Sequence, residues 1–439
     1  MYPKDDPRII WVSPLAQTSG DGSNENPFGS IETSFSKVEP GQTIVLMDGS
    51  YKNDVTVQVS GSIDKPIRIT ADEGARVVVQ ESCWYFYDVS DVILSGITFQ
   101  DSPLGSVAIM GICERNRFER LTFKNCCKSQ KASCSLFFGG SGAACNIVEY
   151  CSFERPRALA SNGRNPDDLT VGLMISEGDA QGGAPITDHV IRKNTFQNYD
   201  YGVLVGTDDA TAHEYGHHIE YNSIDNCVAE GIMVKCGDTL VKGNTIRNCP
   251  NHSISVVTGQ GSVIEDNRIL DCGLGIRVAG RGHSVSNNCI VRCSEEAIRI
   301  MDKNGETGQE TQNVFVENNT CVAWSQSLPH GRFPAVSIGS NVCAIVQKNL
   351  FLGPGKPYEV APDPRAGDKK RRSCNCILDN YSAAHSCEPS SAVSCGTVIF
   401  AGIALDNYDN GTGYGAKGWI VRPDPFDPDQ ESTEPAPGS

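Results

Sequence analysis

A six-residue phrase that recurs at nearly constant spacing most constrains how this chain can fold. The phrase begins with Asn, has Ile at its third position and ends with Cys, and its clearest copies start at Asn222, Asn244, Asn267 and Asn288. The steps between these copies are 22, 23 and 21 residues. A fixed period of this length is the signature of a solenoid, in which each repeat packs only on its neighbours.

A second motif keeps the same period. It is a short segment in which alternate residues are apolar, and its central Ile recurs every 22 residues, at Ile232, Ile254, Ile276 and Ile298. Such alternation predicts strands with one buried face. Together the two motifs predict an all-β fold, a right-handed single-stranded parallel β-helix of about a dozen coils with an N-terminal cap.

The recurring Asn and Cys are expected to have structural roles. Asn residues stacked at an inside corner can hydrogen-bond along the axis, and Asn also tolerates the left-handed corner conformation. One Cys per coil predicts a column of small apolar core residues, formed by Cys227, Cys249, Cys272 and Cys293.

The chain divides into three predicted parts. Residues 1–45 are expected to cap the first coil, with a helical turn at 31–38, because an uncovered coil would leave an open edge. Residues 46–405 form the predicted parallel β-helix. Residues 406–439 form a C-terminal extension that ends in a tail rich in Pro, Asp and Glu, a composition typical of disorder.

Charge and hydrophobicity exclude several classes of protein. Hydrophobic residues make up 39% of the chain, enough for a large core, and no apolar run is long enough to span a membrane. The formal net charge is −16, which disfavours nucleic acid and anionic membranes as partners of the whole molecule. An anionic ligand would therefore need a local basic patch.

The N-terminal part resembles a known group of enzymes. The segments 41–51, 61–71 and 92–99 are similar to the opening of right-handed β-helix polysaccharide lyases, notably the alginate lyase and chondroitinase B group, family 6. The resemblance implies cleavage of an acidic, uronate-containing glycan by β-elimination. It also implies a secreted or periplasmic location, with a cytoplasmic one as the alternative, although no signal-peptide pattern follows Met1.

The resemblance also suggests site residues. In family 6 an Asn and two Glu hold Ca²⁺, a Lys removes the C5 proton, and an Arg lies on the next coil. Glu230 and Lys235 match one Glu and the Lys, and Asn198 matches the metal-binding Asn. Val228 and Val256 stand near the positions of the second Glu and the Arg. Related β-helix alginate lyases work with a Lys and a Tyr, so the expected cofactor is either none or Ca²⁺ held by Asn198 and Glu230.

The repeat register places basic residues on one face. Lys235, Arg277 and Arg299 fall on one outward face within four coils, and another outward column at the strand entries carries Tyr201, Glu230 and His252. A basic strip of this kind would bind the carboxylates of a polyanionic glycan. The alternative is that both Arg residues pair with Glu296 and other carboxylates.

The hypothesis assigns a role to each of these residues. β-Elimination requires a base, an acid and stabilisation of the enediolate, for which we predict Lys235, Tyr201 and Arg277. The predicted substrate-binding residues come from the strip and from long loops beside it, where function is expected: Arg299, His252, His213, Tyr215, Asp208 and Asp209.

Two other functions remain open. Asp208 or Asp209, together with Glu177 or Asp179, could serve a glycoside hydrolase as its paired carboxylates. The third hypothesis is a non-catalytic β-helix that binds glycans or has a purely structural role.

Overall fold

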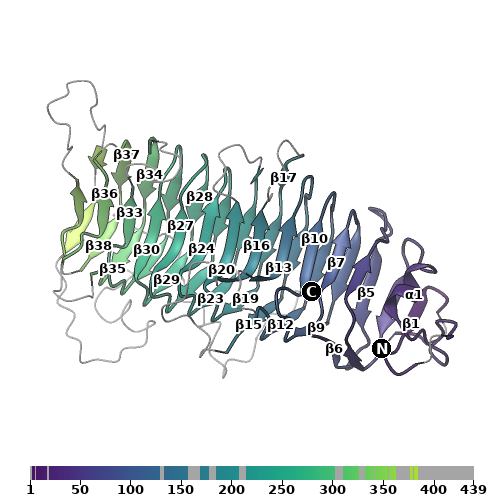
Figure 1. The fold of residues 1–439 in the computed structure, drawn as a ribbon. Helices are drawn as coiled ribbons and strands as arrows, with labels where there is room; N and C mark the ends of the chain where they lie inside the picture. Colours follow the sequence, from purple (N-terminus) through teal and green to yellow (C-terminus); the bar gives the residue numbers. More distant parts are fainter. Residues whose placement is uncertain are drawn as a thin grey trace, which may run out of the picture.

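The computed structural model describes most of the chain as far as residue 383. The described residues are 2–4, 6–16, 19–128, 133–156, 169–176, 184–206, 214–301, 310–325, 332–340, 342–353, 355–361, 376–378 and 380–383. The chain winds through three long parallel sheets in turn, one strand of each per coil, and forms an elongated parallel β-helix (Figure 1). The predicted all-β solenoid is confirmed. The predicted boundary at 405 lies outside the described residues.

Sheet A contains fourteen strands, each paired in parallel with its neighbours. They are β1 (Ile9–Val12), β2 (Thr43–Leu46), β5 (Ile67–Ala71), β8 (Val92–Ser95), β11 (Arg117–Glu119), β14 (Ile147–Glu149), β18 (Val190–Arg192), β22 (His218–Glu220), β25 (Leu240–Lys242), β28 (Val263–Glu265), β31 (Ser284–Ser286), β34 (Val314–Glu317), β37 (Ala344–Gln347) and β40 (Cys376–Leu378).

Sheet B contains thirteen short strands. They are β3 (Gly49–Tyr51), β6 (Val77–Gln80), β9 (Thr98–Gln100), β12 (Thr122–Lys124), β15 (Ser152–Glu154), β19 (Thr195–Gln197), β23 (Ser223–Asp225), β26 (Thr245–Arg247), β29 (Arg268–Leu270), β32 (Cys289–Val291), β35 (Thr320–Val322), β38 (Leu350–Leu352) and β41 (Tyr381–Ala383).

Sheet C contains twelve strands and carries the candidate site. They are β4 (Val55–Val57), β7 (Trp84–Tyr87), β10 (Val107–Met110), β13 (Ser133–Gly139), β16 (Thr170–Ser176), β20 (Tyr201–Gly206), β24 (Glu230–Lys235), β27 (His252–Val256), β30 (Leu274–Val278), β33 (Ile298–Ile300), β36 (Val336–Ile338) and β39 (Tyr358–Val360). A separate two-stranded sheet pairs β17 (Ile186–Thr187) with β21 (Glu214–Tyr215).

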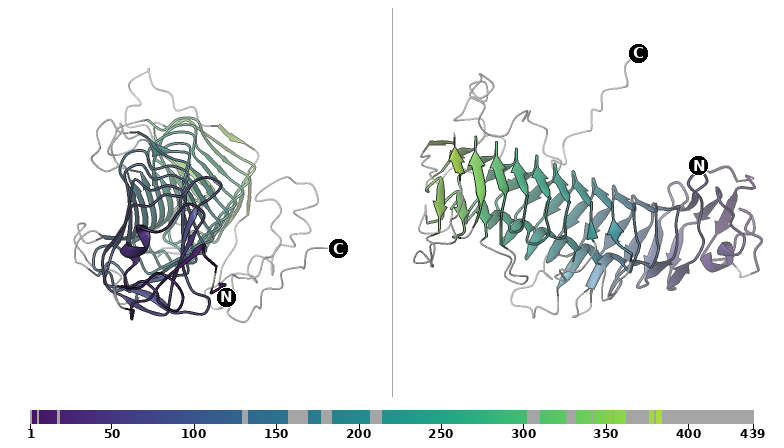
Figure 2. Two further views of the ribbon diagram at one scale, coloured as in Figure 1. Left: turned by 90° about the vertical axis from the view of Figure 1, so that its right-hand side faces the viewer. Right: turned by 90° about the horizontal axis from the view of Figure 1, so that it is seen from above.

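A short helix lies at the N-terminal end of the stack (Figure 2). Helix α1 (Ile31–Phe35) begins after Ser30, whose Oγ accepts a hydrogen bond from the backbone N–H of Thr33. The helix contacts β1 and β4, and β1 pairs in parallel with β2, so the N-terminal segment continues sheet A. The helix is shorter than the predicted turn at 31–38. Among the described residues no helix is long and apolar enough to span a membrane.

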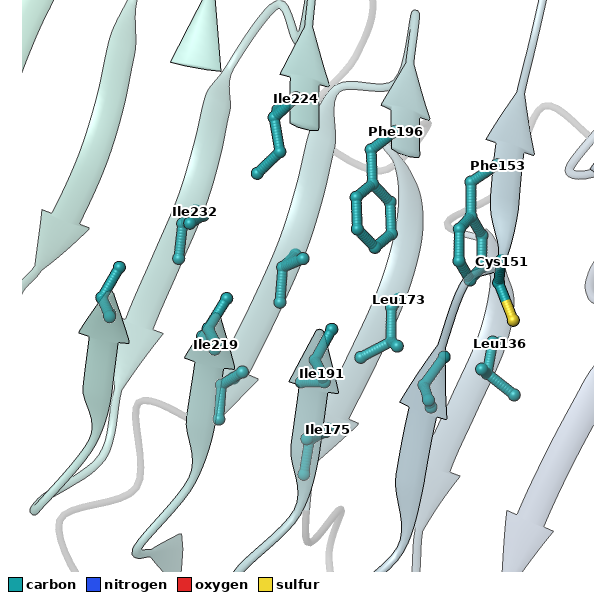
Figure 3. Packing of buried hydrophobic residues seen from close by; sticks show 14 of the residues in the cluster. Leu136, Cys151, Phe153, Leu173, Ile175, Ile191, Phe196, Ile219, Ile224 and Ile232 are labelled. Atoms are coloured by element: carbon teal, nitrogen blue, oxygen red, sulfur yellow. The ribbon is translucent and has the colours of Figure 1, made fainter. Parts of the chain in front are cut away.

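The core is built from apolar columns, one or more from each sheet (Figure 3). Most strands point alternate residues inward, and the inward residues of successive coils lie directly above one another. Sheet B supplies stacked aromatic rings: the Phe123 and Phe153 centroids are 4.5 Å apart, as are those of Phe153 and Phe196. The predicted thiol column is also confirmed, because Cys227, Cys249, Cys272 and Cys293 are buried free thiols.

The recurring Asn residues form a continuous ladder at the corner between sheets A and B. Each Nδ2 donates to the Oδ1 of the next Asn at 3.0 Å, and that same Oδ1 accepts the backbone N–H of the earlier Asn. The members are Asn194, Asn222, Asn244, Asn267, Asn288, Asn319, Asn349 and Asn380. The prediction of axial hydrogen bonding is confirmed.

The left-handed conformation predicted for this Asn column belongs instead to the residue before it. Tyr221, Gly243, Asp266 and Asn287 have φ between 53° and 65°, and they immediately precede the ladder members. The ladder Asn needs its side chain inside the corner, so the chain reverses one residue earlier. The expectation that the ladder Asn itself adopts this conformation was wrong.

A second polar column, at the corner between sheets C and A, includes three buried His residues. The Nδ1 atoms of His189, His217 and His283 accept backbone N–H groups from the preceding coils at 3.1 to 3.3 Å. Their Nε2 atoms are buried and have no hydrogen-bond partner among the described residues. Burial lowers the pKa of His217 to about 3 and that of His283 to about 4, and it lowers the pKa of His189 well below its usual range.

We expect Asn267→Ala to destabilise the protein by about 3 kcal/mol or more, because it removes the acceptor of two buried N–H groups and two donated hydrogen bonds. Denaturant unfolding measures this change. The matched control is Asn251→Ala at an exposed position, which should change the free energy of unfolding by less than about 0.5 kcal/mol. Equal effects of the two substitutions would contradict the ladder's structural role.

Stability should fall as the pH is lowered below the ordinary His pKa of 6.5. Above that pH the three buried His are neutral in both states. Below it the unfolded chain binds protons that the folded chain cannot, so each His costs about 2 kcal/mol between pH 7 and pH 5. Denaturant midpoints at both pH values measure the loss. His217→Asn, which copies Asn146 of the same column, should reduce it by about 2 kcal/mol. The exposed control His218→Asn should leave it unchanged.

Candidate active site on sheet C

The face of sheet C owes its shape to a column of small residues where each strand begins. Strands β16, β20, β24, β27, β30 and β33 follow or contain these positions, which are Gly172, Gly202, Gly231, Ser253, Gly275 and Ala297. A Cβ on Gly231 would lie 3.0 Å from Ile246 Cγ2 in the core, so Gly231 faces inward. Ile232 is also fully buried. Two successive inward residues break the alternation and place both Glu230 and Met233 on the outer face.

Because the alternation is broken in this way, Glu230, His252 and Arg277 meet on the outer face from three successive coils. Glu230 and His252 are paired in register, and Arg277 lies on the next strand. Arg277 Nη2 donates to Glu230 Oε1 at 2.9 Å, and its Nε donates to Ser255 Oγ at 3.1 Å. His252 Nδ1 lies 3.3 Å from the same Glu230 oxygen. The sequence placed these three residues on one face but did not single out Ser255, which stands between Met233 and Arg277 in the outward column.

Two atoms of this cluster have unused hydrogen-bonding capacity. Glu230 is only 5% exposed, yet its Oε2 has no hydrogen-bond partner among the described residues, and neither has the buried His252 Nδ1. Leaving buried polar atoms without partners is costly, so each of these two atoms calls for an explanation, and a contact with a bound ligand is one. The cluster therefore offers an acceptor and an imidazole nitrogen next to a fixed guanidinium, a combination suited to a sugar hydroxyl or carboxylate.

Arg299 is held by two carboxylates on its own coil. Its Nη2 lies 2.6 Å from Glu296 Oε2 and 3.0 Å from Glu295 Oε2. Burial alone would lower the pKa of Arg299, but hydrogen bonds and charge from Glu296 and Glu295 outweigh it and raise the pKa. The alternative of carboxylate pairing is thus confirmed for Arg299, and Arg277 pairs with Glu230. The outward strip is therefore less basic than its Lys and Arg content suggests, and substrate binding by Arg299 stays a prediction.

Lys235 and Tyr201 lie at opposite ends of neighbouring strands. Lys235 ends β24 beside Gly206, and Tyr201 begins β20 beside Glu230. Both side chains are half-buried. From the sheet spacing and the rise per residue, the α-carbons of Lys235 and Arg277 are about 12 Å apart. Two side chains of this length can therefore reach opposite sides of one bound sugar.

The remaining predicted residues lie apart from this cluster or outside the described residues. Asn198 sits in the turn after β19, where its Nδ2 donates to the Arg155 carbonyl and its Oδ1 accepts from Asn226. Tyr215 is in β21, outside sheet C, and is exposed. Asp208, Asp209 and His213 lie outside the described residues, as do Glu177 and Asp179.

The described donors do not fit a calcium site. Ca²⁺ prefers six to eight oxygen ligands. Here one oxygen of Glu230 is committed to Arg277, and both side-chain atoms of Asn198 bond along its own corner. Among the described residues no three His, Cys, Asp or Glu are grouped so that they could hold a metal ion.

The family model described as a right handed beta helix region matches residues 185–330, which include the candidate site. Together with the three parallel sheets, this match decides the fold. The chain is a right-handed parallel β-helix. Two curated proteins are similar to short parts of it. Pectate lyase L of Thermoclostridium stercorarium is 35% identical over 74 residues, 16% of this chain and 6% of that protein. The uncharacterized protein YwoF of Bacillus subtilis (strain 168) is 27% identical over 107 residues, 22% of this chain and 23% of that protein.

Solved structures are similar over most of the β-helix. The family 6 polysaccharide lyase Pedsa3628 from Pseudopedobacter saltans has a TM-score of 0.65 and 18% identity, covering 82% of this chain and 92% of that one. The family 6 alginate lyase AlyGC has a TM-score of 0.62 and 17% identity, covering 81% of this chain and 52% of that one. The GH136 lacto-N-biosidase from Eubacterium ramulus has a TM-score of 0.51 and 15% identity, with coverages of 86% and 68%. The resemblance noted in the N-terminal stretch is confirmed at the level of fold.

We expect Glu230 and Arg277 to be coupled in stability. A double-mutant cycle with Glu230→Gln and Arg277→Met, measured by denaturant unfolding, should give a coupling energy of about 1–3 kcal/mol, because both groups are largely shielded from water. The same cycle at the more exposed pair Asp271 and Arg292 should give less than about 1 kcal/mol. A coupling at Glu230 and Arg277 no larger than at the control pair would show that their contact is not held in solution.

Proposed function

We propose that this β-helix is a polysaccharide lyase that cleaves a uronate-containing glycan by β-elimination on the outer face of sheet C. The observation that carries the proposal is the placement of Lys235 on the same face as the Glu230–His252–Arg277 cluster, in which Glu230 Oε2 has no hydrogen-bond partner among the described residues. The fold shared with family 6 lyases supports it. A secreted or periplasmic location belongs to the same proposal.

In the proposed reaction Lys235, in its neutral form, removes the proton at C5 of the uronate. The electron pair moves into the carboxylate to give an enediolate, and it then forms the C4–C5 double bond as the bond from C4 to the glycosidic oxygen breaks. Tyr201 donates its hydroxyl proton to the leaving oxygen. After the reaction Lys235 releases its extra proton to solvent and Tyr201 regains one from solvent, which restores both groups for the next turnover.

Arg277 is proposed to bind the uronate carboxylate and to stabilise the enediolate. Its Nε and Nη2 are held by Ser255 and Glu230, and its Nη1 hydrogens make no hydrogen bond to a described residue. A guanidinium fixed by two neighbours needs little reorganisation when charge develops on the substrate. In this proposal Glu230 acts as a positioning residue for Arg277. His252, whose Nδ1 lies 3.3 Å from Glu230 Oε1, is placed beside the same uronate carboxylate.

Glycoside hydrolysis is the second candidate, favoured by one observation: the lacto-N-biosidase named above shares the fold. In that case Asp208 or Asp209 would act with Glu177 or Asp179 as acid and base, all of them outside the described residues. The two reactions differ in product. Elimination creates an unsaturated uronate that absorbs in the ultraviolet, whereas hydrolysis creates only new reducing ends. A β-helix that only binds glycans would give neither product.

We expect Lys235→Ala to abolish the ultraviolet-absorbing product, lowering kcat by about 10²-fold or more, because the reaction loses its base. Alginate, pectate, unsulfated chondroitin and a neutral glycan are incubated with the wild-type protein, and both absorbance and reducing ends are followed. Arg277→Ala should lower kcat and raise KM together, because the carboxylate contact exists in both ground and transition states.

The matched control is Lys242→Ala on sheet A, where the Lys pairs with Glu265; its turnover should equal wild type. EDTA should leave the rate unchanged. Near wild-type kcat in Lys235→Ala would overturn the assignment of the base, and reducing ends without absorbance would favour the hydrolase. Loss of activity with EDTA would restore the calcium hypothesis.

A further inference from the structure

An apolar stripe runs along the outer face of sheet C from the N-terminal coils to the candidate site. Strands β7, β10, β13, β16, β20 and β24 lie side by side in Figure 1 and are paired in register. Their aligned outward residues are Tyr85, Ala108, Phe137, Met174, Leu204 and Met233. Tyr87 and Met110 stand next to this column, paired with each other. We call these eight residues the apolar stripe; none of them carries a charged side chain.

The stripe is accessible and has aromatic rings at its far end. Tyr85 is 40% exposed and Tyr87 is 54% exposed, and the other members are partly exposed. The neighbouring Cys83 thiol raises the pKa of Tyr85 to about 12, so its hydroxyl is neutral at physiological pH. Phe137 lies over Gly139 of its own strand, since a Cβ on that Gly would be 2.2 Å from the ring. Continuous apolar surface of this kind on a soluble protein marks a binding site.

The stripe leads directly into the candidate site. Its last member, Met233, is paired with Ser255, which is paired with Arg277. Lys235 lies two residues further along the Met233 strand. The stripe and two of the residues proposed to act in cleavage, Lys235 and Arg277, thus belong to the same columns of one sheet, whereas Tyr201 lies in the strand-entry column with Glu230.

The dimensions and the charge of the stripe indicate its ligand. Six parallel strands span about 24 Å, and one pyranose unit is comparable in length to one coil. Tyr and Phe rings pack against the apolar C–H faces of sugars, as they do in other ligand sites. A polyuronate would bring one carboxylate per unit over a stripe whose eight residues carry no cation, on a protein of net charge −16.

We propose that the apolar stripe binds uncharged sugar units of the substrate, so that the glycan is a heteropolymer in which neutral units accompany the uronate that is cleaved. This inference rests on the proposed function and narrows its substrate class. In the two outward columns that contain the stripe, the basic residues are Lys235, Arg277 and Arg299. All three lie at the end where the uronate would bind. A second copy of the chain is the other occupant that such a surface could take, and the experiment below separates the two.

The test compares the double variant Tyr85→Ser/Tyr87→Ser with Tyr221→Ser, in which an equally exposed Tyr far from sheet C is changed. Binding is measured by affinity electrophoresis in gels containing hyaluronan or unsulfated chondroitin, whose uronates alternate with neutral units, or alginate, which is all uronate. The background is Lys235→Ala, so that binding is read without cleavage. We expect the wild-type stripe to bind the alternating glycans more tightly than alginate, and the double variant to bind them about tenfold more weakly.

Tyr221→Ser should bind like the parent. Unchanged affinity in the double variant, or tighter binding of alginate than of the alternating glycans, would overturn the stripe proposal. A concentration-dependent dimer in sedimentation that the double variant abolishes, with glycan binding intact, would assign the stripe to self-association and also overturn it. These outcomes are independent of catalysis: failure of the proposed lyase function is read from product formation by the Lys235-containing protein, and failure of the stripe from binding.

Discussion

The buried asparagine ladder is the interaction on which the rest of this structure depends. In a parallel β-helix the chain turns at three corners in each coil. Backbone N–H groups buried at these corners need hydrogen-bond acceptors. Here the Oδ1 of a ladder Asn accepts both the backbone N–H and the side-chain Nδ2 of the ladder Asn of the previous coil, as Asn244 does for Asn222. Because this geometry repeats only if each coil brings an Asn to the same point, the ladder supports the register of the coils from Asn194 to Asn380.

A fixed register turns sequence columns into surfaces. The residues that precede and follow the small-residue column stand at equal heights on successive strands, so Glu230, His252 and Arg277 meet although 47 residues separate the first from the last. Gly231 and Ile232 both face inward, and this leaves Glu230 on the outer face with Arg277. A rigid face that holds an arginine between a carboxylate and a hydroxyl suits a reaction in which negative charge develops on a bound acid.

Electrostatics limit what this face can accept. The arginines are compensated by Glu230, Glu295 and Glu296, and the protein as a whole is acidic. The described face therefore offers a short polar site joined to an apolar, partly aromatic track rather than an extended basic groove. Such an arrangement is better matched to one charged sugar among neutral ones than to a uniform polyanion, because each carboxylate that loses water must find a partner.

The sequence alone determined the solenoid, its period, the Asn and Cys columns and the outward placement of Lys235, Arg277 and Arg299, because side-chain direction in a strand alternates and a repeat restores the same direction each coil. Three features depended on the tertiary structure: the residue with positive φ at each corner, the ion pairs and the position of the Phe137 ring. The reversal with positive φ falls on Tyr221 rather than on Asn222, since the Asn side chain must enter the corner. Ion pairing decided which charges remain available, and it depends on side chains of different coils, as between Glu230 and Arg277. The sequence repeat also does not predict the contact of Phe137 with Gly139, because the position of an aromatic ring depends on the space that its neighbours leave.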